Sequence, residues 1–159
     1  IPDECEQDGG TPFCFGDAGC PCANGSATSE QAGCRNSSGL GGKAVGVGNT
    51  SVFNDSLSLQ FSNLTGLVAV IFQGQAINRT PFNDGVKCLS GSLIRIGTAK
   101  PVSGGSTSYP LGLQPKISVK GLVPPTGGVR YYQAVYRNNI GPCGTRLNIT
   151  NGVSVVWVP

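Results

Sequence analysis

Cysteine is the residue of this chain with the most chemistry to offer, because thiolates bind metals, act as nucleophiles and form disulfides. Five of the seven cysteines stand within residues 1–42. The run Cys20-Pro21-Cys22 leaves one residue between two thiols, whereas zinc sites commonly leave about two to four. The chain has no histidine, which excludes a mixed Cys/His zinc site. In a secreted context this grouping predicts disulfides.

Six of the cysteines are expected to form three intrachain disulfides. Cys88 and Cys143 lie in separate strand-end regions, so a bridge between them would staple the body of the domain. Such a bridge stabilises a fold by about 2–4 kcal/mol. The other two bridges would form, in a pairing that the sequence leaves open, among Cys14, Cys20, Cys22 and Cys34.

Asparagine forms a second group of candidate sites, because N-x-[ST] is the acceptor motif for N-linked glycans. With 11 asparagines and 25 serines and threonines, random placement would give roughly two such motifs. The chain contains seven, at Asn24, Asn36, Asn49, Asn54, Asn63, Asn78 and Asn148. We expect several to be glycosylated, first Asn24, Asn36 and Asn49 in the loop-rich half. Asn63 and Asn148 border strands and would serve as turn residues.

Catalytic residues are scarce. The absence of histidine excludes Ser-His-Asp and Cys-His machinery. A glycosidase pair drawn from Asp17, Asp55 and Asp84 is arithmetically available, but each stands among Gly, Asn and Ser residues typical of turns. Asp17, Asn83 and Asp84 could also ligate calcium in loops, although no D-x-[DN]-x-[DN]-G array is present. We therefore expect no enzyme and no cofactor, with structural calcium as the alternative.

Composition and charge narrow the class of protein further. The 159 residues fit one domain, and only 12% of them are charged. The net charge is +3, but no basic run provides the clustered stripe of a nucleic-acid surface. The longest apolar run, Leu67 to Phe72, is far shorter than the ~18 residues of a membrane span. The first residues lack Met and a basic region, which predicts a mature secreted chain.

The sequence divides into an arm (1–12), a Cys-rich stapled segment (13–42) and a strand-rich body (43–159). In the body, Ser56 to Phe61 alternates apolar and polar residues with the period of a strand. Further strands are expected at 67–72, 93–96, 116–120, 129–137 and 147–158, the last broken at Asn151-Gly152. Roughly eight strands predict an all-β fold, an antiparallel sandwich or jelly roll with an irregular, disulfide-stapled N-terminal segment.

The expected core takes one face of each strand. Its residues are Leu57, Leu59, Phe61, Val68, Val70, Phe72, Val119 and Trp157. Tyr132 is a further core candidate. Alternatively, Tyr131, Tyr132, Tyr136 and Trp157 would offer rings to sugars. Alternation sets Tyr131 opposite Tyr132 and Tyr136, so only one set can be exposed.

Several short islands resemble a known group of proteins. They include Phe15-Gly16-Asp17, Cys20-Pro21-Cys22-Ala23-Asn24, Gly33-Cys34-Arg35-Asn36-Ser37, Phe82 to Cys88, Arg130 to Arg137 and Leu147 to Asn151. Over residues 13–157 this is similar to uncharacterised, secreted, Cys-stapled β modules of environmental bacteria. The resemblance implies fold and export, and no activity. The chain departs from that group in its acidic arm, in Cys5 and in its many sequons.

The charge distribution suggests how such a module works. The first eight residues carry four acids and no Lys or Arg, a net −4, whereas the remainder carries +7. Cys5 stands in this arm and is either free or joined to another chain. We expect a non-enzymatic extracellular structural subunit that assembles with itself through its arm into a filament, surface layer or matrix. The alternative is a secreted carbohydrate-binding or adhesion module.

Overall fold

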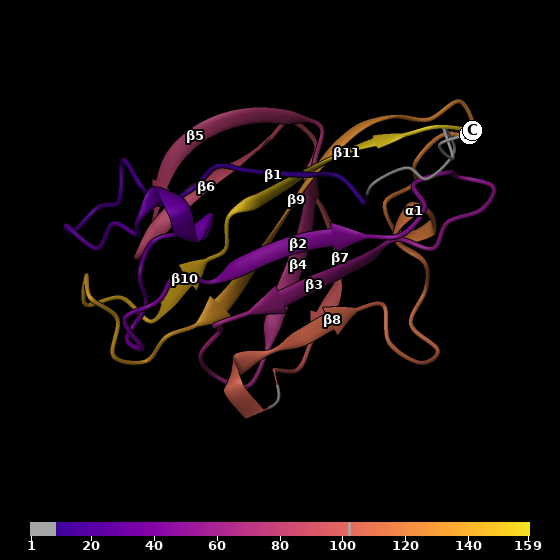
Figure 1. The fold of residues 1–159 in the computed structure, drawn as a ribbon. Helices are drawn as coiled ribbons and strands as arrows, with labels where there is room; N and C mark the ends of the chain where they lie inside the picture. The colour runs from indigo at the N-terminus through magenta and orange to yellow at the C-terminus, as the bar shows by residue number, and fades with distance from the viewer. Residues whose placement is uncertain (1–8, 102) are drawn as a thin grey trace.

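The computed structural model describes residues 9–101 and 103–159 and is almost entirely β (Figure 1). All ladders between its strands are antiparallel. The strands are β1 (Thr11–Phe13), β2 (Lys43–Val47), β3 (Ser58–Ser62), β4 (Ala69–Gly74), β5 (Ala76–Phe82), β6 (Gly85–Ser90), β7 (Ile94–Ala99), β8 (Thr107–Tyr109), β9 (Gly128–Arg137), β10 (Leu147–Ile149) and β11 (Gly152–Trp157). The helical turns are η1 (Thr28–Glu30), η2 (Ser103–Gly105) and α1 (Ile117–Lys120).

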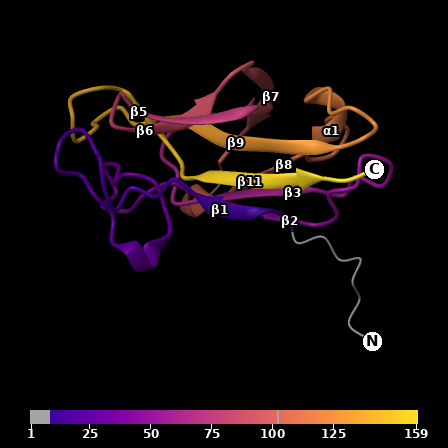
Figure 2. The same ribbon diagram turned by 90° about the horizontal axis from the view of Figure 1, so that it is seen from above.

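The strands form a sandwich with an additional hairpin. A six-stranded sheet has the order β1-β11-β9-β4-β7, with β10 also paired to β9, and a three-stranded sheet has the order β2-β3-β8. The β5–β6 hairpin lies over the opposite face of the larger sheet, so that the layers follow one another in Figure 2. Residues 14–42 contain only η1 and an isolated bridge. The predicted all-β fold with an irregular stapled segment is therefore confirmed.

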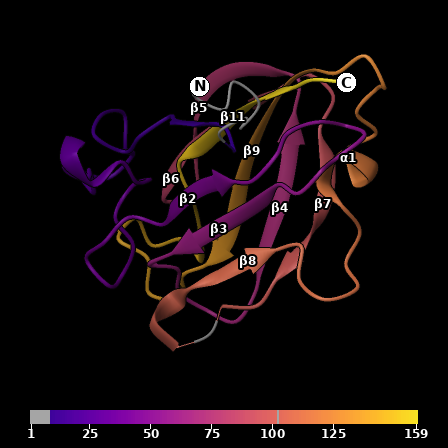
Figure 3. The same ribbon diagram turned by 45° about the vertical axis from the view of Figure 1, so that its right-hand side comes forward.

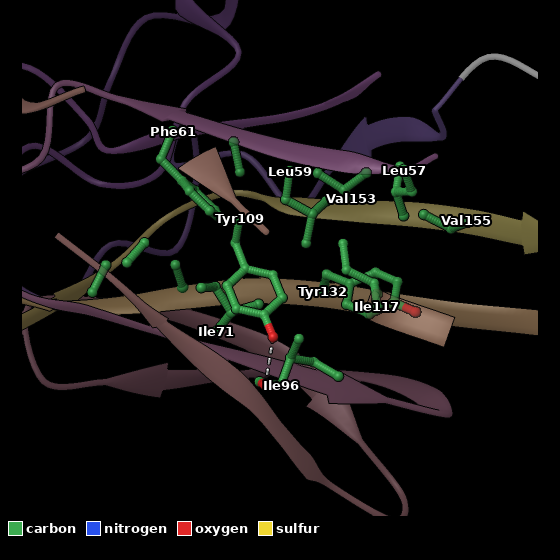
Figure 4. Close-up of a cluster of buried hydrophobic side chains, with 14 of the residues drawn as sticks. Leu57, Leu59, Phe61, Ile71, Ile96, Tyr109, Ile117, Tyr132, Val153 and Val155 are labelled. Carbon is green, nitrogen blue, oxygen red and sulfur yellow. Dashed lines mark hydrogen bonds between the residues drawn. The ribbon is translucent and has the colours of Figure 1, made fainter. Parts of the chain in front are cut away.

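The core lies between the two sheets, as the alternation in the sequence predicted. Leu57, Leu59 and Phe61 are all buried and point from β3 and its preceding residue toward the larger sheet (Figure 4). They meet Ile71, Tyr132, Val153 and other residues of that sheet's inner face. Tyr109 crosses the core and donates a hydrogen bond to the Ile96 carbonyl at 3.2 Å. Trp157 is also buried, as expected.

The predicted face of β4 is wrong. Ala69 and Ile71 are fully buried in the core, whereas Val70 and Phe72 are half-buried on the outer face together with Val68. A continuous apolar run carries no alternation, so it cannot show which face lies inside. The outer face of β4 can also be apolar because the β5–β6 hairpin covers part of it. A pocket of about 140 Å³ remains between them, lined by residues that include Phe72, Phe82, Leu89 and Val135.

The strand predicted at 116–120 is also wrong. These residues form the single turn α1, in which Ile117 is buried and Val119 is 62% exposed. The Asp55 carboxylate accepts a hydrogen bond from the backbone N–H of Ser118 at 2.9 Å. This bond supplies a partner to a donor at the start of the turn, where no helical acceptor exists. A contact with a residue 63 positions away is not visible in local periodicity.

The break predicted at Asn151-Gly152 is confirmed in its position. β10 and β11 pair with successive parts of the same strand, β9, so the dipeptide interrupts one long edge and does not close a hairpin. Residues 9–12, which the sequence assigned to the arm, belong to the domain. Gly9 is buried, and Thr11 and Pro12 pair with β11.

Candidate functional site

Three disulfides fix the Cys-rich segment, but not in the predicted pairing. The bonds are Cys14–Cys88, Cys20–Cys34 and Cys22–Cys143, with Cα atoms 6.3, 5.8 and 5.4 Å apart. The expected Cys88–Cys143 bridge is wrong, because each of these cysteines pairs with the N-terminal segment. The N-terminal segment buries few apolar side chains of its own. Two of its disulfides tie it to the body. Cys5 lies outside the described residues.

Three sequon asparagines act as hydrogen-bonding staples between the segment and the body. The Asn24 amide donates to the carbonyls of Arg35 and Asp84 at 2.9 and 2.7 Å. The Asn36 amide donates to the Asn63 carbonyl and to the Tyr136 hydroxyl at 2.8 and 3.0 Å. In each case the buried Nδ2 donates both of its hydrogens. Backbone carbonyls outside regular strands thereby gain the hydrogen-bond partners that a neighbouring strand would otherwise supply.

Asn148 is held in the same way. It is fully buried and donates to the carbonyls of Cys34 and Arg35 at 3.4 and 3.2 Å. An amide nitrogen with both hydrogens bonded inside the protein has no room for a sugar. Asn24 and Asn36, which the sequence favoured as glycosylated residues, therefore have buried and hydrogen-bonded amides in the folded chain. Of the other sequons, Asn54 and Asn78 are exposed, and Asn49 and Asn63 are half-buried.

Three of the four rings considered as a sugar-binding platform are buried. Tyr132, Tyr136 and Trp157 are at most 2% exposed. The indole of Trp157 donates to the Tyr132 hydroxyl at 2.9 Å, and burial raises the pKa of Tyr136 to about 12. Tyr131 is half-buried, with its ring 5.5 Å from that of Phe13 in an edge-on contact. The alternation argument placed these rings correctly on opposite faces.

The described acids are occupied in hydrogen bonds within the chain. Asp17 accepts from Thr28, Glu30 accepts from the backbone of Ala27, and Asp55 accepts from α1. Asp84 is fully buried and accepts from the Thr145 hydroxyl at 2.7 Å. Within residues 9–101 and 103–159, no group of three or more His, Cys, Asp or Glu residues is placed to hold a metal. Asp17 and Asp84, two of the residues considered for calcium, each accept a hydrogen bond from a nearby hydroxyl.

A groove of about 660 Å³ lies on the outer face of the three-stranded sheet. This sheet lies in front of β4 and β7 in Figure 3. Lys43 and Val45 of β2 line the groove, and Lys100 reaches it from the end of β7. The remaining lining residues are Gln60, Phe61, Ser62, Ser106, Thr107, Ser108 and Leu111. The groove thus offers two ammonium groups, several polar side chains and no acid.

The alternation within β2 explains why its lysine faces outward. Ala44 points into the core, which places Lys43 and Val45 on the solvent face. This part of the groove could be anticipated from the sequence. Lys100 could not, because it follows a strand of the other sheet and reaches the groove through tertiary packing.

The free edge of β2 is covered. Gly33 donates its backbone N–H to the Gly42 carbonyl at 2.9 Å, just before β2 begins. Two residues further along, the Asn151 side chain accepts a hydrogen bond from the Ala44 N–H and donates one to the Ala44 carbonyl. At Gly42 and Ala44, a strand from another molecule would therefore find these groups already bonded.

Four other edge strands are protected by different means. On β7, the carbonyls of Ile96 and Thr98 accept side-chain bonds from Tyr109 and Gln114. β5 contains Pro81, which has no N–H, and its ladder with β6 is irregular. β1 and β8 have three residues each. These are the devices by which native sheets avoid edge-to-edge pairing, so faces are left as the surfaces for contact.

The body carries its positive charge without internal compensation. All 11 lysines and arginines stand in the described part of the chain, where no ion pair joins any of them to an acid. The four acids of this part are bonded to hydroxyl and backbone groups, as described above. The four remaining acids all stand within residues 1–8.

No family model, curated protein or solved structure matches this chain. Among the helices in the described ranges, none has the length and apolar character that a membrane span requires.

Proposed function

We propose that this protein is a non-enzymatic structural subunit of an extracellular assembly. In this assembly the acidic segment, residues 1–8, binds the body of a neighbouring copy. The observation that carries the proposal is the separation of charge: −4 on the acidic segment against +7 on a body whose described acids are already bonded. Attraction between these two parts favours head-to-tail contact between copies, which produces rings or open filaments.

The construction of the body supports an extracellular role. Three disulfides fit an oxidising compartment, and two of them tie an irregular segment to the sandwich. The buried amide staples and protected edges describe a rigid unit that resists non-specific pairing. A unit of this kind suits repeated use as a building block. The glycan-binding alternative has no exposed set of the predicted rings to support it.

Removal of the acidic segment tests the proposal. The full chain and a chain of residues 9–159 would be compared by electron microscopy and sedimentation at low salt. We expect assemblies from the full chain and monomers from the shortened one, with equal thermal stability. A matched control keeps the length and removes the charge, through Asp3→Asn, Glu4→Gln, Glu6→Gln and Asp8→Asn; it should also stay monomeric. Equal assembly by all three chains would refute the proposal.

A further inference from the structure

We infer that the groove on the outer face of the β2-β3-β8 sheet is the acceptor for the acidic segment of a neighbouring copy. This inference rests on the proposed function and specifies where the contact is made. Two modes of docking are open to an extended segment: addition to a sheet edge or seating on a face. Because the edges are capped by side chains, shortened or interrupted by proline, the face is the mode that remains.

The charge pattern of the segment suits a face. In an extended chain alternate side chains point the same way, with about 7 Å between residues i and i+2. Glu4, Glu6 and Asp8 have this i, i+2 spacing in the sequence. Bound in an extended conformation, that spacing would present a row of carboxylates to the surface beneath it.

The groove offers the complementary groups. Lys43 of β2 and Lys100, which follows β7, both line it. Within the described residues, no ion pair or side-chain hydrogen bond engages either ammonium group. The lining also includes side chains able to donate hydrogen bonds to carboxylates, such as Gln60 and Ser108. Leu111, which is 55% exposed, adds an apolar contact at the rim.

The position of Gly9 and the length of the acidic segment set how far that segment can reach. Traced backward from Phe13 to Gly9, β1 passes along β11 to a point where Gly9 lies against Gly46 and Val47. This is the same direction as β2 from Lys43 to Val47. Gly9, the first described residue, therefore lies at the end of β2 farther from Lys43. The eight residues of the acidic segment span at most about 28 Å when extended, enough to bridge to an adjacent molecule.

Two complementary variants test the docking. One is the chain of residues 9–159, which keeps the groove and lacks the segment. The other keeps the segment and carries Lys43→Glu with Lys100→Glu. Each alone should be a monomer at concentrations where the full chain assembles, because each lacks one half of the contact. Mixed in equal amounts at low salt, they should form a one-to-one dimer by sedimentation velocity and no larger species.

The control carries the same change of charge elsewhere. Lys116→Glu with Lys120→Glu alters two exposed lysines outside the groove, one just before α1 and one at its end. We expect it to assemble like the full chain, whereas the groove variant should need about tenfold more protein or fail to assemble. Thermal unfolding of each variant would show that it is folded. If the groove variant assembles normally while the shortened chain does not, the groove is the wrong acceptor and the proposed function survives. A mixture that stays monomeric would also overturn the inference.

Discussion

The side-chain amide of Asn151 hydrogen-bonds both backbone groups of Ala44, a residue 107 positions earlier in the chain. Its oxygen accepts from the Ala44 N–H at 2.8 Å, and its nitrogen donates to the Ala44 carbonyl at 3.0 Å. Both residues are buried. One side chain therefore takes the place of a neighbouring strand at the edge of β2 and links the smaller sheet to the larger one.

Replacing Asn151 with alanine should lower the free energy of unfolding by several kcal/mol. It leaves a buried donor and a buried acceptor without partners, at about 1–3 kcal/mol each. Urea unfolding followed by tryptophan fluorescence measures the change, since Trp157 is buried in the core. Asn139→Ala, at an exposed position, is the matched control and should change little. Equal losses in the two variants would mean that the Ala44 contacts contribute nothing particular.

Leu59→Ala should cost about 2–5 kcal/mol of stability. Leu59 is fully buried between the sheets, so the truncation leaves a cavity among close-packed side chains. Gln60→Ala on the exposed face of the same strand should stay within about 0.5 kcal/mol of the parent chain. Denaturant unfolding of the pair measures the difference, and similar stabilities would show that this face of β3 is not the buried one.

Stability should fall as the pH rises from 10 toward 12. Burial raises the pKa of Tyr136 from 10.0 to about 12, and burial also raises that of Tyr132. The unfolded chain therefore loses these protons at lower pH than the folded chain, so alkali favours unfolding by a few kcal/mol. Below pH 10 the contribution is fully present. Tyr136→Phe should make the dependence of unfolding free energy on pH shallower in this range, and an unchanged slope would contradict the assignment.

In a glycosylating host, sugars should attach at Asn54 and Asn78. These side chains are exposed, whereas the amides of Asn24, Asn36 and Asn148 are buried and fully hydrogen-bonded. Peptide mapping by mass spectrometry locates each modified residue. Glycans found on any of the three buried asparagines in the folded protein would be incompatible with the staples described here.

The strand pattern could be predicted where alternation was visible. Leu57, Leu59 and Phe61 alternate with polar residues, and the structure buries all three. Continuous apolar runs carry no such signal, which is why the inner face of β4 was assigned wrongly. Ser118 illustrates a different limit, because its bond to Asp55 connects two parts of the chain that no local pattern relates.

The candidate site was only partly predictable. The charge of the acidic segment is visible in the sequence, and the alternation of β2 places Lys43 on an outer face. The disulfide pairing was not accessible, since Cys14 and Cys22 bond to partners 74 and 121 positions away. The sequon asparagines also have a second, structural use. The amide that makes asparagine a glycan acceptor also makes it a two-donor bridge for irregular backbone.

Sedimentation velocity of the full chain across concentration, at low and at high salt, tests the central claim most directly. If the acidic segment binds the body of a neighbour, mass should grow with concentration at low salt. It should fall toward that of the 16.2 kDa chain as ionic strength rises, because salt screens exposed charges over about 10 Å at 0.1 M. A monomer at every concentration and at low salt would contradict self-assembly through the acidic segment.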